Sequence, residues 1–215
     1  MSVPQPVAFD YDALARAPVA TDPFAHCVVP NFIGPDDLNA VVASLPEMAS
    51  GGSFPPESLA LSPLVRAMTD ELQGPRLKGL IAGKFGLDLD DAPTMLTLRG
   101  RTREKDGRVH CDSTAKRVTI LLYLNPENES WARREGCLRL LRGPDDVEDY
   151  VVEVPPVNGT LLIFPNGPTT WHGHRQYVGR RYTIQLNYME TSAKARHEMR
   201  RHRLSALAKR LPFAA

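Results

Sequence analysis

The C-terminal half of this chain is a succession of short β-prone segments, and this constrains the fold more than any other feature. The segments are rich in β-branched and aromatic residues and are separated by turn-forming residues. Between Thr94 and Met189 they read TMLTLR, RVHCD, RVTILLYLN, GCLRLLR, YVVEV, GTLLIFP and RRYTIQLNYM. Strands that follow one another without intervening helices are typical of a sandwich or barrel, and not of a βαβ fold.

Helical patterns precede and follow this β-rich region. A helix is predicted over residues 32–45, where Pro35 suits the first turn and apolar residues recur at helical spacing. Two more are predicted, one from Ser62 through Leu72 and one after Gly74 that stops near Gly86. The tail SAKARHEMRRHRLSALAKRL returns to helical spacing. We therefore expect an α+β fold.

The chain is expected to form a single domain. With 215 residues, 42% of them hydrophobic, it can bury one substantial core. Within residues 1–215 we expect an N-terminal arm over 1–25 that lies on the surface or stays loose. A mainly helical support should follow over 32–90, then a β core over 94–190 and a C-terminal helix over 191–211.

Charge and cysteine content exclude several classes of protein. The 26 basic and 25 acidic residues nearly cancel, so no field of the whole molecule attracts nucleic acid or a membrane surface. The three cysteines form no C-x-x-C pair, which argues against a disulfide framework and a structural zinc site. The N-terminus lacks the apolar segment of a signal peptide, and no run reaches membrane-spanning length. A cytoplasmic protein is expected.

The triplet His110-Cys111-Asp112 is the first candidate metal-binding element. On a strand, side chains alternate between faces, so His110 and Asp112 point the same way. An imidazole and a carboxylate side by side suit a divalent first-row metal. Taken alone the triplet is a weak signal, because a surface histidine beside a turn-forming aspartate gives the same pattern.

A second candidate lies in the segment WHGHR, which precedes the last β-prone run. His172 and His174 share the same strand parity, so periodicity does not choose between them as the missing ligand. Gly173 lets the backbone of another segment come close. Whichever histidine is not a ligand is interpreted as an ordinary strand-edge residue.

The last β-prone run has one polar face. Its inward positions are predicted to be Arg181, Thr183, Gln185 and Asn187, while Arg180 points outward. A polar stripe inside a small barrel is costly unless it binds something, and a guanidinium suits the far carboxylate of a dicarboxylate. The alternative is a pair of solvated arginines at a strand edge.

Residues 110–189 resemble the double-stranded β-helix core of the Fe(II)/2-oxoglutarate oxygenases, and in particular the prolyl-hydroxylase-like branch. In that branch an H-x-D motif leads into a strand that ends in Tyr-Leu-Asn. A tryptophan, a G-x-L strand, an apolar strand, the distal histidine and an arginine about nine residues later then follow. The matching residues here are Tyr123-Leu124-Asn125, Trp131, Gly136-Cys137-Leu138, Leu161–Phe164, His172 and Arg181.

This resemblance implies a fold and an activity. It implies a double-stranded β-helix (jelly-roll) core supported by the N-terminal helices and the C-terminal helix. Iron would be held by His110, Asp112 and His172, since the motif spacing favours His172 over His174. Arg181 and Tyr123 would bind the distal carboxylate of 2-oxoglutarate, with Thr183 or Thr119 assisting. The implied reaction hydroxylates a substrate with O2 and releases succinate and CO2.

The substrate is left open between a protein residue and a small metabolite. Nucleic acid is not expected, because the nucleic-acid dealkylating branch carries a second arginine where this chain has Asn187. The basic segment 99–108 is either a lid or a solvated loop. In the tail, seven Lys or Arg accompany an apolar stripe that is expected to pack on the domain. The sequence does not indicate an oligomeric state.

Two other functions fit the same residues less well. One is a non-catalytic β-helix module that uses the pocket to bind a small ligand or partner. The other is a cupin-like metal enzyme that does not use 2-oxoglutarate. The filled metal positions count against the first, and Arg181 at the expected separation counts against the second.

Overall fold

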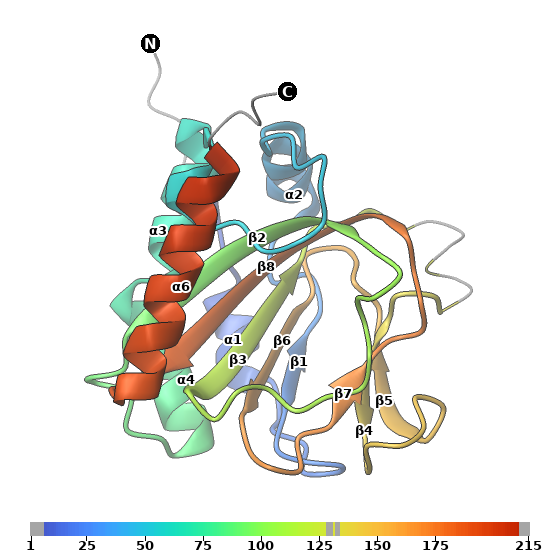
Figure 1. The fold of residues 1–215 in the computed structure, drawn as a ribbon. Helices are drawn as coiled ribbons and strands as arrows, with labels where there is room; N and C mark the ends of the chain where they lie inside the picture. Colours follow the sequence, from blue (N-terminus) through green and yellow to red (C-terminus); the bar gives the residue numbers. More distant parts are fainter. Residues whose placement is uncertain (1–6, 128–130, 132–133, 211–215) are drawn as a thin grey trace.

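Two antiparallel sheets form the body of the computed structural model, which describes residues 7–127, 131 and 134–210, without the side chains of 202–210 (Figure 1). The larger sheet has the order β1 (Cys27–Val29), β6 (Leu161–Pro165), β3 (Lys116–Tyr123), β8 (Gly179–Met189) and β2 (Thr94–Thr102). The smaller sheet has the order β5 (Tyr150–Val154), β4 (Leu138–Leu141) and β7 (His172–Gly173). All the strand pairs are antiparallel, so the expected mixture of helices and antiparallel strands is confirmed.

The larger sheet buries a different core on each face because successive side chains of a strand alternate. One face contributes Leu98, Ile120 and Ile184 to the main core, which the helices share. The other face turns toward the smaller sheet. There Tyr123 packs in a second cluster with Leu138 of the smaller sheet. The space between the two sheets is therefore lined by the second face.

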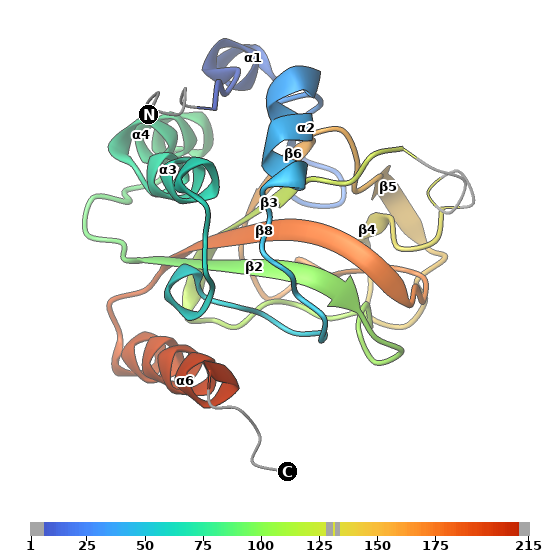
Figure 2. The same cartoon turned by 90° about the horizontal axis from the view of Figure 1, so that it is seen from above.

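The helical support forms where the sequence predicts it. Helices α2 (Pro35–Ala43), α3 (Pro63–Leu72) and α4 (Pro75–Phe85) each begin at a proline, whose missing N–H costs nothing in the first turn. The hydroxyl of Ser62 caps α3, and Gly86 ends α4 in the left-handed conformation. Figure 2 shows these helices on one side of the larger sheet and α6 (Ala193–Arg210) on the other.

The N-terminal segment differs from the predicted loose arm. Residues Tyr11–Arg16 form helix α1, in which Tyr11 and Leu14 are buried in the main core. The Tyr11 hydroxyl also donates a hydrogen bond of 2.7 Å to Glu71 on α3. The prediction missed this contact because one short apolar turn among prolines and alanines gives no periodic signal. Residues 1–6 lie outside the described part of the chain.

Two segments near the pocket also differ from the sequence-based expectation. The RVHCD segment forms no regular strand, and only His110 makes an isolated bridge, to His172. The basic segment 99–108 does not begin as a loop, because β2 extends through Thr102. The turn after it is closed by Asp106, which accepts hydrogen bonds from the backbone and the guanidinium of Arg103. Residues 99–102 therefore belong to the sheet, and they are not part of a freely moving lid.

The C-terminal helix α6 spans Ala193–Arg210, against an expected 191–211, and Leu211 lies outside the described residues. The apolar stripe expected on its second half falls on side chains that are likewise outside the description. Ser113 donates a hydrogen bond of 2.6 Å to Glu198, which fixes the first half of α6 beside the loop that follows His110. Along the described chain, no helix combines the length and apolarity that crossing a membrane requires.

Candidate metal centre

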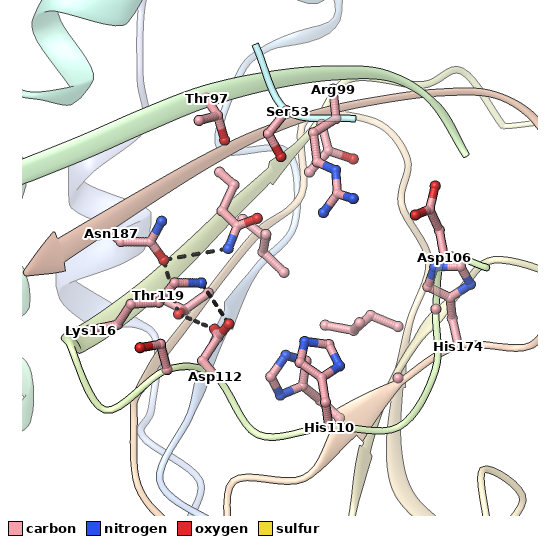
Figure 3. A pocket seen from close by; sticks show the side chains of 18 of the residues that line it. Ser53, Thr97, Arg99, Asp106, His110, Asp112, Lys116, Thr119, His174 and Asn187 are labelled. Atoms are coloured by element: carbon pink, nitrogen blue, oxygen red, sulfur yellow. Dashed lines mark hydrogen bonds and ion pairs between the residues drawn. The ribbon is translucent and has the colours of Figure 1, made fainter. Parts of the chain in front are cut away.

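A cavity of about 370 Å³ opens between the two sheets (Figure 3). Strand register arranges the side chains of β2, β8 and β3 in rows across its floor. The first row is Met95, Asn187 and Thr119; the second is Thr97, Gln185 and Leu121; the third is Arg99, Thr183 and Tyr123. The polar face predicted for the last strand is therefore the face that lines the cavity.

His110, Asp112 and His172 converge at one wall of this cavity. One ligand atom from each of the three side chains lies within 4.8 Å of the other two. The two histidines face each other because their backbones form a bridge, in which each N–H donates to the other's carbonyl at 3.0 Å. Gly173 permits this approach, since a Cβ there would lie 2.9 Å from the carbonyl oxygen of Gly107.

Both histidines present the same ring nitrogen to the cavity. Nδ1 of His110 donates to the carbonyl of Arg108 at 2.8 Å, and Nδ1 of His172 donates to the carbonyl of Thr170 at 2.9 Å. A carbonyl only accepts, so Nδ1 carries the proton and Nε2 carries a lone pair. Burial lowers the pKa of His172 to about 4, which keeps this imidazole neutral at physiological pH.

A network of side chains holds Asp112 as an oriented carboxylate. Lys116 and the hydroxyl of Thr119 each donate to one of its two oxygens at 2.6 Å. The amide of Asn166 donates to the same hydroxyl at 3.0 Å, which leaves the hydroxyl proton for Asp112. Burial alone would raise the pKa of the Asp112 carboxyl, but the charge of Lys116 and these hydrogen bonds lower it.

His174 lines the same cavity but does not belong to the cluster of three. Its ring packs against Gly107, where a Cβ would lie 2.3 Å from the imidazole, and its Nδ1 donates to the carbonyl of Arg175 at 2.8 Å. Burial, together with the charge of Arg181, lowers its pKa to about 4. His174 is thus a neutral side chain farther along the wall, and the geometry favours His172 as the third ligand.

Arg181 and Tyr123 lie together at the floor of the cavity, and we call this pair the Arg181–Tyr123 cradle. Arg181 is 7% exposed, and its Nε donates to the carbonyl of Gly136 at 3.0 Å. Its guanidinium carbon lies 5.3 Å from the centre of the Tyr123 ring. Among the described residues, the fully buried Tyr123 hydroxyl has no hydrogen-bond partner. Burial raises the pKa of Tyr123 to about 12, so the hydroxyl keeps its proton. It can therefore donate a hydrogen bond to an acceptor in the cavity.

Asn125 holds the start of β8, on which Arg181 lies. Its side-chain oxygen accepts from the N–H of Tyr182 at 2.6 Å, and its amide donates to the carbonyl of Tyr182 at 2.9 Å. The Tyr-Leu-Asn motif thus has a physical basis: Tyr123 faces the cavity and Asn125 fixes the neighbouring strand. The exposed Arg180 points away, as predicted.

Sequence reasoning does not place several side chains of this cavity, among them Lys116 and Arg99. Lys116 was not predicted, although it follows Asp112 at a spacing of four residues. Arg99 is expected at the start of a segment that is either a lid or a solvated loop, whereas it lies on β2 and shares strand parity with Thr97. Thr119 was expected to assist a carboxylate ligand but instead donates to Asp112, whereas Thr183 does lie beside Arg181, whose Nη1 is 3.4 Å from its hydroxyl.

Two imidazoles and one carboxylate on one side of a metal leave its other positions open for ligands that react. The donor set therefore fits a non-haem Fe(II) ion, and the Arg181–Tyr123 cradle fits the distal end of a dicarboxylate.

Residues 100–189 match the family model of the 2OG-Fe(II) oxygenase superfamily. No curated protein matches the sequence. Among solved structures, the fold is similar to a prolyl-4-hydroxylase from Pseudomonas putida, with 18% identity over 84% of this chain and 90% of that one and a TM-score of 0.50.

Two further solved structures share the fold. Prolyl 4-hydroxylases from Phytophthora capsici give 15% identity over 92% of this chain and 71% of that one, with a TM-score of 0.59. HygX from Streptomyces hygroscopicus, with nickel and 2-oxoglutarate bound, gives 16% identity over 80% of this chain and 88% of that one, with a TM-score of 0.52. At these identities the likeness is one of fold.

Proposed function

Because residues 100–189 match the family model of the 2OG-Fe(II) oxygenase superfamily, we propose that this chain is an Fe(II)- and 2-oxoglutarate-dependent dioxygenase, and we propose which of its residues form the active site. His110, Asp112 and His172 bind the iron. Arg181 and Tyr123 bind the distal carboxylate of 2-oxoglutarate, with Thr183 beside them. The enzyme hydroxylates its substrate with O2 and releases succinate and CO2.

The single observation that carries this assignment is the convergence of three ligand atoms within 4.8 Å of one another beside an unsatisfied tyrosine hydroxyl. The first feature supplies two imidazoles and one carboxylate that are close enough together to bind one metal ion. The second marks a position where a buried donor needs an acceptor. A metal site and a carboxylate site in one cavity are what a chelating 2-oxo acid requires.

The protein's own residues have separate tasks in this reaction. The iron, when bound, supplies the site at which O2 is activated by oxidative decarboxylation of the 2-oxo acid. Lys116 and Thr119 keep Asp112 ionised and fixed in orientation, and the carbonyls of Arg108 and Thr170 fix the tautomers of the two histidines. Tyr123 holds its proton at the hydroxyl oxygen and donates it in a hydrogen bond to the cosubstrate carboxylate.

We also propose that the two sheets together form a double-stranded β-helix. Their antiparallel pairing and the shared apolar cluster between them support this, as does the likeness of fold to the prolyl 4-hydroxylases. The substrate is a peptidyl residue or a small metabolite, as expected from the sequence, and nucleic acid is not expected. The cytoplasmic location also stays a prediction.

Alanine substitution of each histidine of the His-Gly-His segment tests the iron assignment. His172→Ala is expected to remove stoichiometric Fe(II) binding, because two ligands remain and the third coordinate bond is lost. His174→Ala should retain it, since its ring lies outside the cluster of three. The measurement is bound iron after anaerobic loading and desalting, with circular dichroism as a control for folding. Loss of iron from His174→Ala alone would reverse the assignment.

A further inference from the structure

Arg99 is a charged side chain that the proposed chemistry leaves unused. It lies on β2 in the row with Thr183 and Tyr123, so its side chain is on the face that lines the cavity. Figure 3 shows its guanidinium extending from β2 into the cavity, across from His110. An arginine placed inside a catalytic cavity, opposite the metal-binding wall, is in a position to contact whatever lies there.

The acidic residues around the cavity are already engaged by other groups. Asp106 receives hydrogen bonds from Arg103, and Asp112 receives them from Lys116 and Thr119. Glu198 accepts from Ser113 at 2.6 Å. Within the described part of the chain, no carboxylate forms an ion pair with Arg99.

Arg99 differs from Arg139, another arginine of the same chain, in its ion-pair partners. Arg139 is 1% exposed and has Glu148 and Glu153 at 2.7 Å each, which is how a buried guanidinium is normally stabilised. Arg99 is partly buried and lacks such partners. Burial lowers its pKa, Asp106 opposes this, and the charge of Arg181 lowers it further. A guanidinium stays protonated under these conditions, so the cavity holds a cation that is not in an ion pair with any carboxylate of the described residues.

The cosubstrate does not supply that anion if the proposed function is correct. 2-Oxoglutarate carries two carboxylates, of which one chelates the iron and the other lies between Arg181 and Tyr123. Both are then engaged. A second guanidinium on the neighbouring strand remains available for another anionic group, and a planar fork of donors matches a carboxylate.

We propose that Arg99 binds the carboxylate of the primary substrate, and that the substrate is a small carboxylic acid. This rests on the proposed function, because it assigns both ends of 2-oxoglutarate elsewhere. The size of the cavity, about 370 Å³, suits a small molecule. An internal residue of a peptide with a neutral side chain offers no carboxylate to Arg99, so a small acid is favoured over a prolyl peptide.

The test compares acids with their own amides on the complete protein loaded with Ni(II) and 2-oxoglutarate, which binds ligands without turnover. The probes are the monocarboxylates from propionate to hexanoate and the proteinogenic L-amino acids, each against its primary amide. Binding is measured from the shift of the melting temperature with ligand concentration. At least one acid is expected to bind about tenfold or more tightly than its amide, as for a buried charge-assisted pair.

Three variants determine whether Arg99 is responsible for this preference. Arg99→Gln should lose it, and Arg99→Lys should keep part of it, because the charge remains and the fork is lost. Arg101→Gln is the matched control: it lies on the same strand, is exposed, and does not line this cavity, so the preference should persist. The inference is wrong if no acid is preferred, or if the preference survives in Arg99→Gln.

A second readout separates the substrate from the cosubstrate. The affinity for 2-oxoglutarate, measured from its visible absorption on Fe(II) without O2, should change less than about threefold in Arg99→Gln. A loss as large as that of Arg181→Gln would place Arg99 in the cosubstrate site and overturn the inference, while leaving the proposed function intact. Absence of the absorption in the wild type would contradict the proposed function itself.

Discussion

Replacing Asp112 with alanine is expected to lower Fe(II)-dependent succinate formation by about 1,000-fold or more, because it removes the anionic ligand from the proposed metal site. Asp112 is the only carboxylate in the described cluster of three ligands, and its charge offsets part of the charge of the bound cation. The measurement is succinate released from 2-oxoglutarate with and without Fe(II).

Asp106→Ala is the matched control for this substitution. Asp106 lines the same cavity, but it accepts its hydrogen bonds from Arg103 and lies outside the cluster of three. Its loss should lower turnover by about tenfold or less, because it removes hydrogen bonds from Arg103 and leaves the three proposed metal ligands in place. Melting temperatures of both variants show whether they remain folded. Retained turnover in a folded Asp112→Ala protein would remove Asp112 from the metal site.

Replacing Arg181 with glutamine is expected to raise the concentration of 2-oxoglutarate needed for half-maximal turnover by roughly 100-fold. The substitution removes the charge from a side chain that is 7% exposed and leaves Tyr123 as the remaining donor to the distal carboxylate. At saturating cosubstrate the turnover number should change far less, since the proposed role places Arg181 at the end of the cosubstrate away from the reacting atoms.

Arg180→Gln is the control for Arg181, because the two arginines are adjacent in sequence and differ in exposure. Because Arg180 is exposed, the Arg180→Gln substitution is expected to leave the half-saturating concentration of 2-oxoglutarate unchanged. Equal effects in the two variants would mean that general electrostatic attraction, and not a specific contact, governs 2-oxoglutarate binding. An unchanged concentration in Arg181→Gln would mean that the anchor lies elsewhere.

Local signals in the sequence were sufficient for much of the fold. Prolines at the first helical position marked the starts of α2, α3 and α4, and alternation on β8 marked the face that carries Arg181 and Thr183. These features depend on neighbouring residues of one element. They are therefore readable without knowing what the element packs against.

The parts that sequence reasoning missed depend on contacts between distant segments. Helix α1 is held by packing of Tyr11 and Leu14 against residues far along the chain. His110 meets His172 through a single bridge and not through a regular strand, so the expected alternation of RVHCD did not apply. The geometry that brings the ligands together is tertiary, and parity alone did not choose between His172 and His174.

The position of Arg99 in the cavity also depends on contacts between distant segments. Its position in a run of basic residues indicates either a lid or a solvated loop. Its pairing with Thr183 across two strands, which puts it beside Tyr123, follows from the register of β2 with β8. Register is set by the whole sheet and is not visible in either strand alone.

The central claim is that iron and 2-oxoglutarate meet in this cavity, and an anaerobic titration tests it most directly. Purified protein is mixed with Fe(II) and then with 2-oxoglutarate while the visible absorption is recorded. We expect a charge-transfer band that saturates with the 2-oxo acid in the wild type and is absent in His172→Ala. A folded wild-type protein that never shows the band would contradict the account and favour a binding module or a metal enzyme that does not use 2-oxoglutarate.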